Sequence, residues 1–367
     1  MGALKSSKTA IKRKIPVPTL PVVRIMEVRT SPQAIVIPGE GTVRPLREIN
    51  LVPQVSGKVV ALSPSMVNGG AFQRGELLVR IDPVDYRLAV TLAQARVKDA
   101  ESTLKYVKAE AEAAREEWRV HNGDMPGAGT EPPPLVAKEP QLMAAQAKLE
   151  AEQANLKKAR LNLKRTELRA PFNGRVSQEA VGVGQYVNAG QGLATLYATD
   201  ATEIVLPLEE ADLAWFHVPG FTQGDRPGAG ATVRARLAGQ DLSWEGRVVR
   251  TEGKLDERTR MINVVVQVEK PYARKPPLAI GLFVTVEIRG AVLADTTQIP
   301  RQALRQDDVV WVVNGGRLRF HRVEVARRDG DKVLIKSGLR DGDKVAVSTL
   351  KAPTDNMAVR AVFMEEG

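Results

Sequence analysis

The sequence of 367 residues contains no cysteine. This absence excludes a disulfide framework, a zinc site with thiolate ligands, a thiol nucleophile and a lipid-modified cysteine. Aromatic residues make up only 4% of the chain, which favours thin modules and helices packed through small side chains over a thick core of large rings. No apolar run approaches the roughly 20 residues that a membrane-spanning helix needs.

The composition is that of a folded chain, with 43% hydrophobic and 26% charged residues. At roughly 150 residues per domain, the length predicts two to three domains. The net charge is +10, and six of the excess cations lie in the first 24 residues, which contain no acid: Lys5, Lys8, Lys12, Arg13, Lys14 and Arg24. Because the rest of the chain is close to balanced, a basic face for nucleic acid is not implied.

The basic start resembles the first part of an export signal, but no apolar stretch follows it. Three prolines between Ile15 and Pro21 favour an extended, solvated strip instead. We therefore expect residues 1–21 to be a flexible basic arm, or the remnant of a removed anchor. A tether to a membrane surface is the alternative.

Two segments show the periodicity of long helices. In the first, from Val84 to Val120, apolar residues alternate at spacings of three and four and neither glycine nor proline occurs: Val90, Ala93, Val97, Ala100, Leu104, Val107, Ala111, Ala114 and Trp118. Such a helix is roughly 55 Å long at 1.5 Å per residue. The second set of such positions is Leu142, Ala145, Leu149, Glu152, Leu156, Ala159, Leu163 and Thr166, with Pro140 in the first turn.

The region between the two segments, from His121 to Glu139, holds three glycines and four prolines and cannot continue a helix. We therefore expect the helices to fold back as an antiparallel pair. Two core helices of a larger bundle are the alternative, which the strand-like pattern of the remaining chain disfavours.

The segments on either side of the helices resemble each other. The first contains Gly57, Gly69, Phe72, Gly75, Leu78 and Ile81, and the second contains Gly174, Gly184, Val187, Gly190, Leu193 and Leu196. A half of roughly 30 residues cannot bury a core alone, so the two halves are expected to pair. The helices are then an insertion into one small β-domain.

The run from Leu168 to Val176, together with the run from Val52 to Val59, resembles the periplasmic adaptor subunits, or membrane fusion proteins, of tripartite efflux pumps. The stretch from Trp244 to Met261 and the run from Gly281 to Val284 resemble the barrel domain of adaptors of the resistance-nodulation-division (RND) type. In this interpretation Pro171 stops the second helix, and Asn173-Gly174 supplies a tight turn. The resemblance implies an elongated multidomain α+β protein. An antiparallel two-helix coiled-coil hairpin is inserted in a split lipoyl-like β-sandwich, followed by an antiparallel β-barrel and a β-rich membrane-proximal domain.

The remainder of the chain changes to period two, as at Val233, Ala235 and Leu237, which predicts a small antiparallel barrel. After Ile299, short strands over 309–313, 322–325, 332–335 and 344–347 alternate with Asn-Gly and Asp-Gly turns. The expected domains are the basic arm (1–21), strands completing the membrane-proximal and barrel domains (22–48), the first lipoyl-like half (49–82), the α-helical hairpin (83–168), the second lipoyl-like half (169–198), the β-barrel domain (199–293) and the membrane-proximal domain (294–367).

No catalytic constellation stands out. The three histidines, His121, His217 and His321, are far apart, the eight methionines are scattered, and Gly182-x-Gly184 lacks the third glycine of a dinucleotide fingerprint. We predict no enzyme activity, no cofactor and no metal site. A lipoyl-like fold also suggests a carrier with a modified lysine at the turn joining the halves, but the helices occupy that junction.

The resemblance implies a non-enzymatic periplasmic adaptor, associated with the inner membrane, that forms a ring, possibly a hexamer. It would link an inner-membrane RND transporter to an outer-membrane channel protein in the export of small molecules, without binding nucleic acid. The alternatives are an adaptor of an ATP-driven or major-facilitator exporter and an extracytoplasmic substrate-binding module.

The hairpin tip is the expected channel contact. Many family members carry an arginine, a leucine and a serine at fixed spacing there, and this chain does not show that triplet. We therefore predict channel contacts at Trp118, Arg119, Leu135 and Val136, although Trp118 also fits as the last residue of its heptad series. Arg258 and Arg260, in the expected barrel loop, are predicted to contact the pump or a neighbouring adaptor, with a plain solvated loop as the alternative.

Overall fold

The computed structural model describes residues 20–122, 131–237, 239–255 and 257–364. The predicted basic arm (1–21) therefore lies outside the described residues except for Leu20 and Pro21. Contacts divide the chain into two compact units. Unit 1 comprises Met1–Pro38, Ala211–His217 and Glu287–Gly367, and unit 2 comprises Gly39–Glu210 and Val218–Val286.

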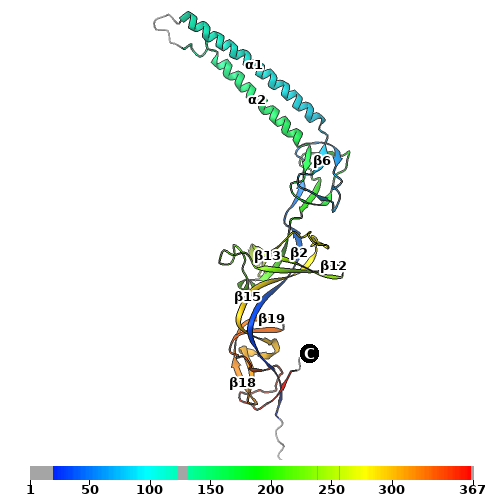
Figure 1. Cartoon of the computed structure of the whole chain (residues 1–367), viewed down its shortest axis with the longest axis vertical. Coiled ribbons are helices and arrows are strands. Elements are labelled where there is room, and N and C mark those ends of the chain that lie inside the picture. The colour runs from blue at the N-terminus through cyan, green and yellow to red at the C-terminus, as the bar shows by residue number, and fades with distance from the viewer. Residues whose placement is uncertain (1–19, 123–130, 238, 256, 365–367) are drawn as a thin grey trace, which may run out of the picture. The chain divides into compact units, whose positions relative to one another are not determined.

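Two long helices of unit 2 extend side by side from the end of the chain segment that holds strand β6, Leu77–Ile81 (Figure 1). Helix α1 (Val84–Asn122) begins directly after Asp82-Pro83, where the Asp82 carboxylate accepts a hydrogen bond from the Val84 N–H at 3.1 Å. Helix α2 (Glu139–Lys164) carries a proline in its first turn, as the sequence predicted. It ends at Lys164, where the Arg165 N–H bonds to the Leu161 carbonyl. The prediction that Pro171 stops this helix is therefore wrong, because a strand already lies between the helix and that proline.

The two helices run antiparallel and contact each other along their length. Asp99 of α1 pairs with Lys148 of α2 at 4.0 Å, and Arg115, farther along α1, pairs with Glu139, the first residue of α2, at 3.6 Å, so the two helices run in opposite directions. Glu110 pairs with Lys138, just before α2, at 3.0 Å. The buried side chains belong to the predicted heptad series: Ala93, Val97, Ala100 and Ala111 of α1 and Ala145 of α2. Small side chains thus allow the backbones to approach closely.

Eight short strands flank the helices. Before α1 come β3 (Glu48–Leu51), β4 (Gly57–Leu62), β5 (Ala71–Phe72) and β6 (Leu77–Ile81), and after α2 come β7 (Glu167–Arg169), β8 (Gly174–Glu179), β9 (Tyr186–Val187) and β10 (Ala194–Ala198). They form two sheets, in the orders β3-β10-β8-β5 and β7-β6-β4-β9. Each sheet takes two strands from each side of the helices, so Gly57 and Gly174 lie in one module. One apolar cluster, including Val59, Leu78, Ile81, Val176, Val187, Leu193 and Leu196, fills it.

The two halves of this sandwich repeat each other's hydrogen bonds. The Gly69 N–H bonds to the Val176 carbonyl, and the Gly184 N–H bonds to the Val59 carbonyl, both at 2.8 Å. In the same way, the Gly75 N–H bonds to Ala170 O and the Gly190 N–H bonds to Pro53 O. The internal repeat in the sequence is thus a repeat in space, and each half supplies the partners that the other lacks.

Gly174 has a different role from the one expected. It begins strand β8, and an added Cβ would lie 2.2 Å from the Tyr197 carbonyl oxygen and 2.9 Å from the Phe72 ring. The prediction of a tight Asn-Gly turn is therefore wrong at this position. Glycine is required here because two backbones approach each other, and not because the turn needs a positive φ.

The rest of unit 2 is antiparallel sheet. Strands β11 (Ala201–Glu209), β12 (Gly230–Leu237), β13 (Gln240–Leu255) and β14 (Met261–Glu269) follow the order β12-β13-β14-β11. The order continues with β2 (Thr30–Pro45) and β15 (Phe283–Pro300), of which residues 39–45 and 283–286 belong to unit 2, and β15 also pairs with β12. Within this sheet the Arg250 guanidinium makes two hydrogen bonds, at 2.6 and 2.8 Å, to the carboxylate of Glu203, which is buried. A buried carboxylate needs such a partner.

Unit 1 contains a six-stranded sheet in the order β16-β17-β21-β1-β22, with β18 paired to β17. Its strands are β1 (Val22–Glu27), β16 (Leu304–Arg305), β17 (Val309–Asn314), β18 (Arg317–Arg322), β21 (Lys344–Ala346) and β22 (Arg360–Phe363). β19 (Glu324–Asp329) and β20 (Lys332–Ser337) pair with each other, and β20 pairs with β15. Two apolar clusters cover the sheet, one including Val28, Val310 and Val345 and the other including Val23, Ile25 and Leu318.

The predicted strand over 322–325 is wrong. The chain forms two strands there, β18 and β19, and the buried Val323 lies between them. Its N–H bonds to the Asp308 carbonyl at 2.9 Å, one residue beyond the last pair of the β17–β18 ladder, Val309 with Arg322. The unit also takes in short helix η1 (Glu210–Trp215), in which Asp212 pairs with Arg327 of β19 at 3.0 Å.

Taken element by element, the described chain is an α+β protein, rich in strands and with two long α-helices.

Candidate functional site

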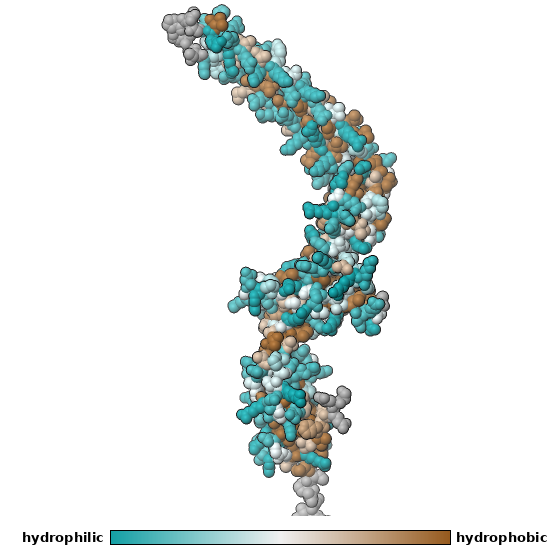
Figure 2. Space-filling model, in the orientation of Figure 1, coloured by the Kyte–Doolittle hydropathy of each residue, from teal (hydrophilic) through white to brown (hydrophobic). Residues whose placement is uncertain are grey.

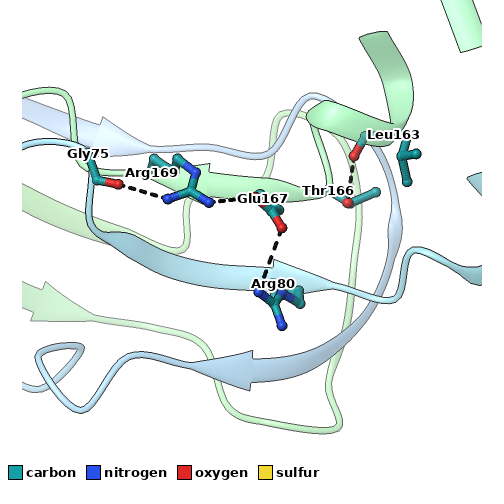
Figure 3. Close-up of polar contacts among 6 residues, drawn as sticks. All are labelled: Gly75, Arg80, Leu163, Thr166, Glu167 and Arg169. Carbon is teal, nitrogen blue, oxygen red and sulfur yellow. Dashed lines mark hydrogen bonds and ion pairs between the residues drawn. The ribbon is translucent and has the colours of Figure 1, made fainter. Parts of the chain in front are cut away.

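The helices leave the sandwich through a polar junction on strands β6 and β7 (Figure 3). Glu167 pairs with Arg80 of β6 at 3.6 Å and with Arg169 at 2.7 Å, and Arg169 also donates to the Gly75 carbonyl at 3.0 Å. Beside it, the buried Thr166 hydroxyl donates to the Leu163 carbonyl at 2.7 Å. These contacts fix the direction in which α2 enters the sandwich.

Two hollows flank the base of the helices. The first, of about 460 Å³, is lined by Leu51, Val52, Gln54, Leu161, Lys164, Arg165, Glu167, Leu168 and Arg169. The second, of about 640 Å³, is lined by Ser56, Gly57, Lys58, Asp82, Val84, Asp85, Tyr86, Ala89, Ala159, Asn162 and Tyr186. Three cations and one acid line the first hollow, whereas two acids and one cation line the second.

The other end of the helical pair is asymmetric. Helix α1 has 39 residues and α2 has 26, so α1 is 13 residues longer, about 20 Å at 1.5 Å per residue. The extra length lies at the tip, because the ion pair between Lys138 and Glu110 places the start of α2 beside the last third of α1. A segment of turns, Pro133–Lys138, precedes α2; we call it the tip segment.

Hydrogen bonds hold the tip segment in place. The Ala137 N–H bonds to the Pro133 carbonyl, the Glu139 N–H bonds to the Pro134 carbonyl, and the Ala137 side chain is buried. Lys138 adopts the left-handed conformation with φ of 55°, which is uncommon outside glycine and asparagine. The segment therefore has a defined conformation.

The four predicted channel-contact residues lie at this end. Trp118 and Arg119 occupy the last turns of α1. The Trp118 indole N–H is buried and has no hydrogen-bond partner among the described residues, and Arg119 is exposed and pairs with Glu116 on its own helix. In the tip segment, the Leu135 side chain is 74% exposed and that of Val136 is 40% exposed. Their contact with a channel stays a prediction.

Glu110, Tyr106 and Lys138 form a hydrogen-bonded polar group at the tip that the sequence did not predict. The Glu110 carboxylate is hydrogen-bonded by Lys138 and by Tyr106, and these bonds, that of Lys138 first, lower its pKa. The bond to Glu110 in turn raises the pKa of Tyr106. The i,i+4 spacing of Tyr106 and Glu110 could have suggested half of this group, but Lys138 arrives across a loop that no periodicity describes.

Arg258 and Arg260 lie between β13 and β14, in or next to the turn that joins these strands. Both are exposed, and Arg260 has a positive φ of 56°. They belong to other elements than the tip residues, which lie on α1 and in the tip segment. The contact of Arg258 and Arg260 with a pump or a neighbouring adaptor stays a prediction.

Two family models match the chain. The barrel-sandwich hybrid domain of RND membrane fusion proteins matches residues 47–199, and the C-terminal permuted SH3 domain of the same proteins matches residues 297–352. The chain belongs to the membrane fusion protein family of RND-type pumps. The first match includes both halves of the sandwich and the whole helical pair.

Curated relatives and solved structures resemble the chain over most of its length. Multidrug resistance protein MdtA from Klebsiella pneumoniae subsp. pneumoniae is 26% identical over 341 residues, covering 90% of this chain and 77% of that protein. The structure of MacA from Actinobacillus actinomycetemcomitans has a TM-score of 0.62 at 19% identity and covers 88% of this chain and 99% of that one. A MacA–MexA chimera with the α-hairpin domain of Pseudomonas aeruginosa MexA has a TM-score of 0.61 at 21% identity, with the same coverage.

In the described part of this membrane fusion protein, neither α1 nor α2 is long and apolar enough to cross a membrane. In the same residue ranges, no three histidine, aspartate or glutamate side chains are placed to hold a metal ion.

Proposed function

We propose that the protein is a non-enzymatic periplasmic adaptor that links an inner-membrane RND transporter to an outer-membrane channel in the efflux of small molecules. The observation that carries this proposal is the match of the barrel-sandwich hybrid model across residues 47–199, in which paired helices grow out of a split sandwich. The relative from Klebsiella, named a multidrug resistance protein, supports the export of drugs.

We further infer the domain division that this function requires. The interleaved pairing of β3–β6 with β7–β10 supports one lipoyl-like domain made of residues 49–82 and 169–198, with residues 83–168 as the inserted hairpin. The antiparallel order of β11–β14 supports a β-barrel domain over 199–293, and the match to the permuted SH3 domain supports a membrane-proximal domain over 294–367. Residues 22–48 complete the last two domains.

The adaptor function is tested by expressing the protein together with a candidate RND transporter and a candidate outer-membrane channel. We expect the three proteins to purify together and the set to restore drug resistance to a strain lacking its own adaptor. Resistance without this protein, or its purification with an ATP-driven or major-facilitator exporter instead, would contradict the proposal.

The tip residues are tested by cross-linking to the channel. Replacing Trp118 and Leu135 together by serine should abolish the cross-link and leave the helix content unchanged. A matched control replaces Met143, also exposed on the helical pair, and Val183 of the sandwich by serine. Normal cross-linking of the first variant would remove Trp118 and Leu135 from the contact.

The second candidate contact is tested by charge reversal. Changing Arg258 and Arg260 to glutamate should weaken co-purification with the transporter. The same change at the exposed Arg96 and Lys98 of α1 should not. Equal retention of the transporter by both variants would leave Arg258 and Arg260 as residues of a solvated turn.

A ring of adaptors needs two different surfaces on each subunit, because head-to-tail contacts close a ring. The two hollows at the helix base suit this role, since the lining of one has an excess of cations and that of the other an excess of acids. Reversing Lys164 and Arg165 to glutamate should lower the oligomer mass. Adding Asp85→Lys to this double variant should restore part of the oligomer mass. An unchanged mass in the double variant would show that the ring contact lies elsewhere.

A further inference from the structure

The edge of the six-stranded sheet in unit 1 exposes apolar side chains. β22 is the last strand in the sheet order and runs parallel to β1, with Val22 opposite Arg360 and Arg24 opposite Val362. All four residues of β22 are exposed. Proteins usually cover or charge such an edge, because its free backbone groups and apolar side chains invite association.

One face of the β1–β22 pair carries a defined set of side chains. Val23 and Ile25 point into a core cluster, so the alternation of a strand places Val22 and Arg24 on the opposite face, together with Arg360 and Val362. Met364 continues this row, since its N–H bonds to the Ile25 carbonyl at 3.0 Å. We call these five residues, Val22, Arg24, Arg360, Val362 and Met364, the edge patch.

The edge patch combines exposed aliphatic and cationic side chains. Val22 is 56% exposed, Val362 44% and Met364 46%. Its charged residues are both arginines, and within the described residues neither Arg24 nor Arg360 forms an ion pair. Leu20, also half exposed, and Phe363, whose ring lies 5.5 Å from the Lys344 ammonium, border the patch. Figure 2 shows hydrophobic residues gathered on the surface at the lower end of this unit.

The sequence before the patch adds charge of the same sign, whereas two acids, Glu365 and Glu366, follow Met364. Residues 1–19 contain five cations and no acid: Lys5, Lys8, Lys12, Arg13 and Lys14. Clusters of lysine and arginine are attracted to anionic lipid. Aliphatic side chains beside such a cluster can enter the boundary between headgroups and acyl chains.

We propose that the edge patch binds the surface of a bilayer that contains anionic phospholipid. Its arginines contact the headgroup phosphates, and Val22, Val362 and Met364 lie in the boundary layer. Arginine is common in protein–protein hot spots as well, but the patch has neither tryptophan nor tyrosine, the aromatic residues that accompany it there, so a protein partner fits less well. The inference stands on unit 1 alone and does not depend on the adaptor function.

The test measures binding of the purified full chain to vesicles by flotation. We expect binding to vesicles that mix phosphatidylglycerol with phosphatidylcholine, weaker binding at high salt, and little binding to phosphatidylcholine alone. Val362→Glu with Met364→Glu should weaken binding at least about tenfold, because acids replace apolar groups beside the lipid phosphates. The matched control, Val183→Glu with Val292→Glu, adds the same charge at two sites that are both 64% exposed, and should bind nearly as the original chain does.

Three outcomes would overturn the inference. The first is equal weakening by the patch and control variants, which would reduce the effect to net charge. The second is loss of binding when Lys5, Lys8 and Lys12 become serine, with the patch variant unaffected, which would assign the lipid to the arm alone. The third is unchanged vesicle binding with loss of co-purified transporter, which would make the patch a protein contact. Circular dichroism and the melting temperature verify that each variant is folded.

Discussion

The sandwich and the helical pair are stabilised in different ways. Eight short strands of the sandwich share one cluster of buried apolar side chains drawn from both ends of a 150-residue stretch. The two helices are far longer than any of these strands but have only five buried side chains, four of them alanines. Helices satisfy their backbone hydrogen bonds locally, whereas strands as short as these depend on distant partners.

Because of this difference, the sandwich and the helical pair have different structural roles. The sandwich supplies the cooperative core that sets where the helices begin and end, and the helices present a long surface with little core of their own. Damage to the sandwich should therefore spread to the helices, whereas damage to the helices should stay local.

The largest effect is expected for Gly174→Ala. An added methyl group would lie 2.2 Å from the Tyr197 carbonyl oxygen, so strands β8 and β10 must separate, at a cost of about 3 kcal/mol in the free energy of unfolding. Urea unfolding followed by circular dichroism measures this loss. Gly182→Ala is the control, since nothing lies within 4 Å of its Cβ. Equal stability of the two variants would show that β8 and β10 can separate around the added methyl group at little cost.

A matched pair of valine truncations compares the regions directly. Val176 is fully buried in the sandwich and Val97 is 8% exposed between the helices. Val176→Ala should cost about 2 kcal/mol and Val97→Ala about 1 kcal/mol, because the helix site can close around the smaller side chain. Hydrogen exchange should rise in sandwich and helix peptides for the first variant, and only in helix peptides for the second. Faster hydrogen exchange in sandwich peptides of the Val97→Ala variant would contradict the view that damage to the helices stays local.

A third prediction uses the two halves of the sandwich. The Glu76 carboxylate accepts hydrogen bonds from the Gln73 N–H and the Ser63 hydroxyl, and these bonds, that of Gln73 first, lower its pKa below the ordinary 4.5. Its stabilising effect is complete above pH 4.5 and is lost as the pH falls through the lowered value. Gln191 makes the same turn contact, to the Asn188 N–H, in the other half, and it has no charge.

Glu76→Gln should therefore reduce the loss of stability on acidification, and Gln191→Glu should increase it. Unfolding by urea at a series of pH values measures both. An unchanged pH dependence in Glu76→Gln would mean that other carboxylates control acid unfolding.

The smallest effect is expected at the tip. Arg115 and Glu139 form an ion pair at 3.6 Å with both side chains about half exposed. Such pairs contribute about 0.5 kcal/mol or less and are screened by salt. A double-mutant cycle with alanine at both positions measures the coupling, and a coupling several times larger would show that the helical pair depends on charges more than on its alanines.

Periodicity in the sequence was sufficient to locate the two helices and the repeat around them. The heptad series named every side chain that is buried between the helices, from Ala93 to Ala145, because helix contacts repeat at fixed spacing. The paired glycines, such as Gly69 and Gly184, indicated equivalent turns, and their N–H groups make equivalent bonds. Proline and glycine alone were weaker guides, since Pro171 ends no helix and Gly174 makes no positive-φ turn.

The tip and the edge patch were beyond such reasoning. Trp118 and Leu135 could be named as candidates, but the conformation of Pro133–Lys138 and the bond from Lys138 to Glu110 depend on how the loop folds back. The parallel pairing of β22 with β1 joins residues more than 330 positions apart. The local sequence pattern of either strand does not predict that the other is its partner.

The sequence by itself determined the helices, the glycine turns and the two matching halves, because these follow from short-range periodicity and backbone conformation. Only the tertiary structure decided which strands pair, why Gly174 is a glycine and which side chains gather at the sheet edge. Those features depend on contacts between distant segments, and such contacts form only when the chain closes its long loops around a shared core.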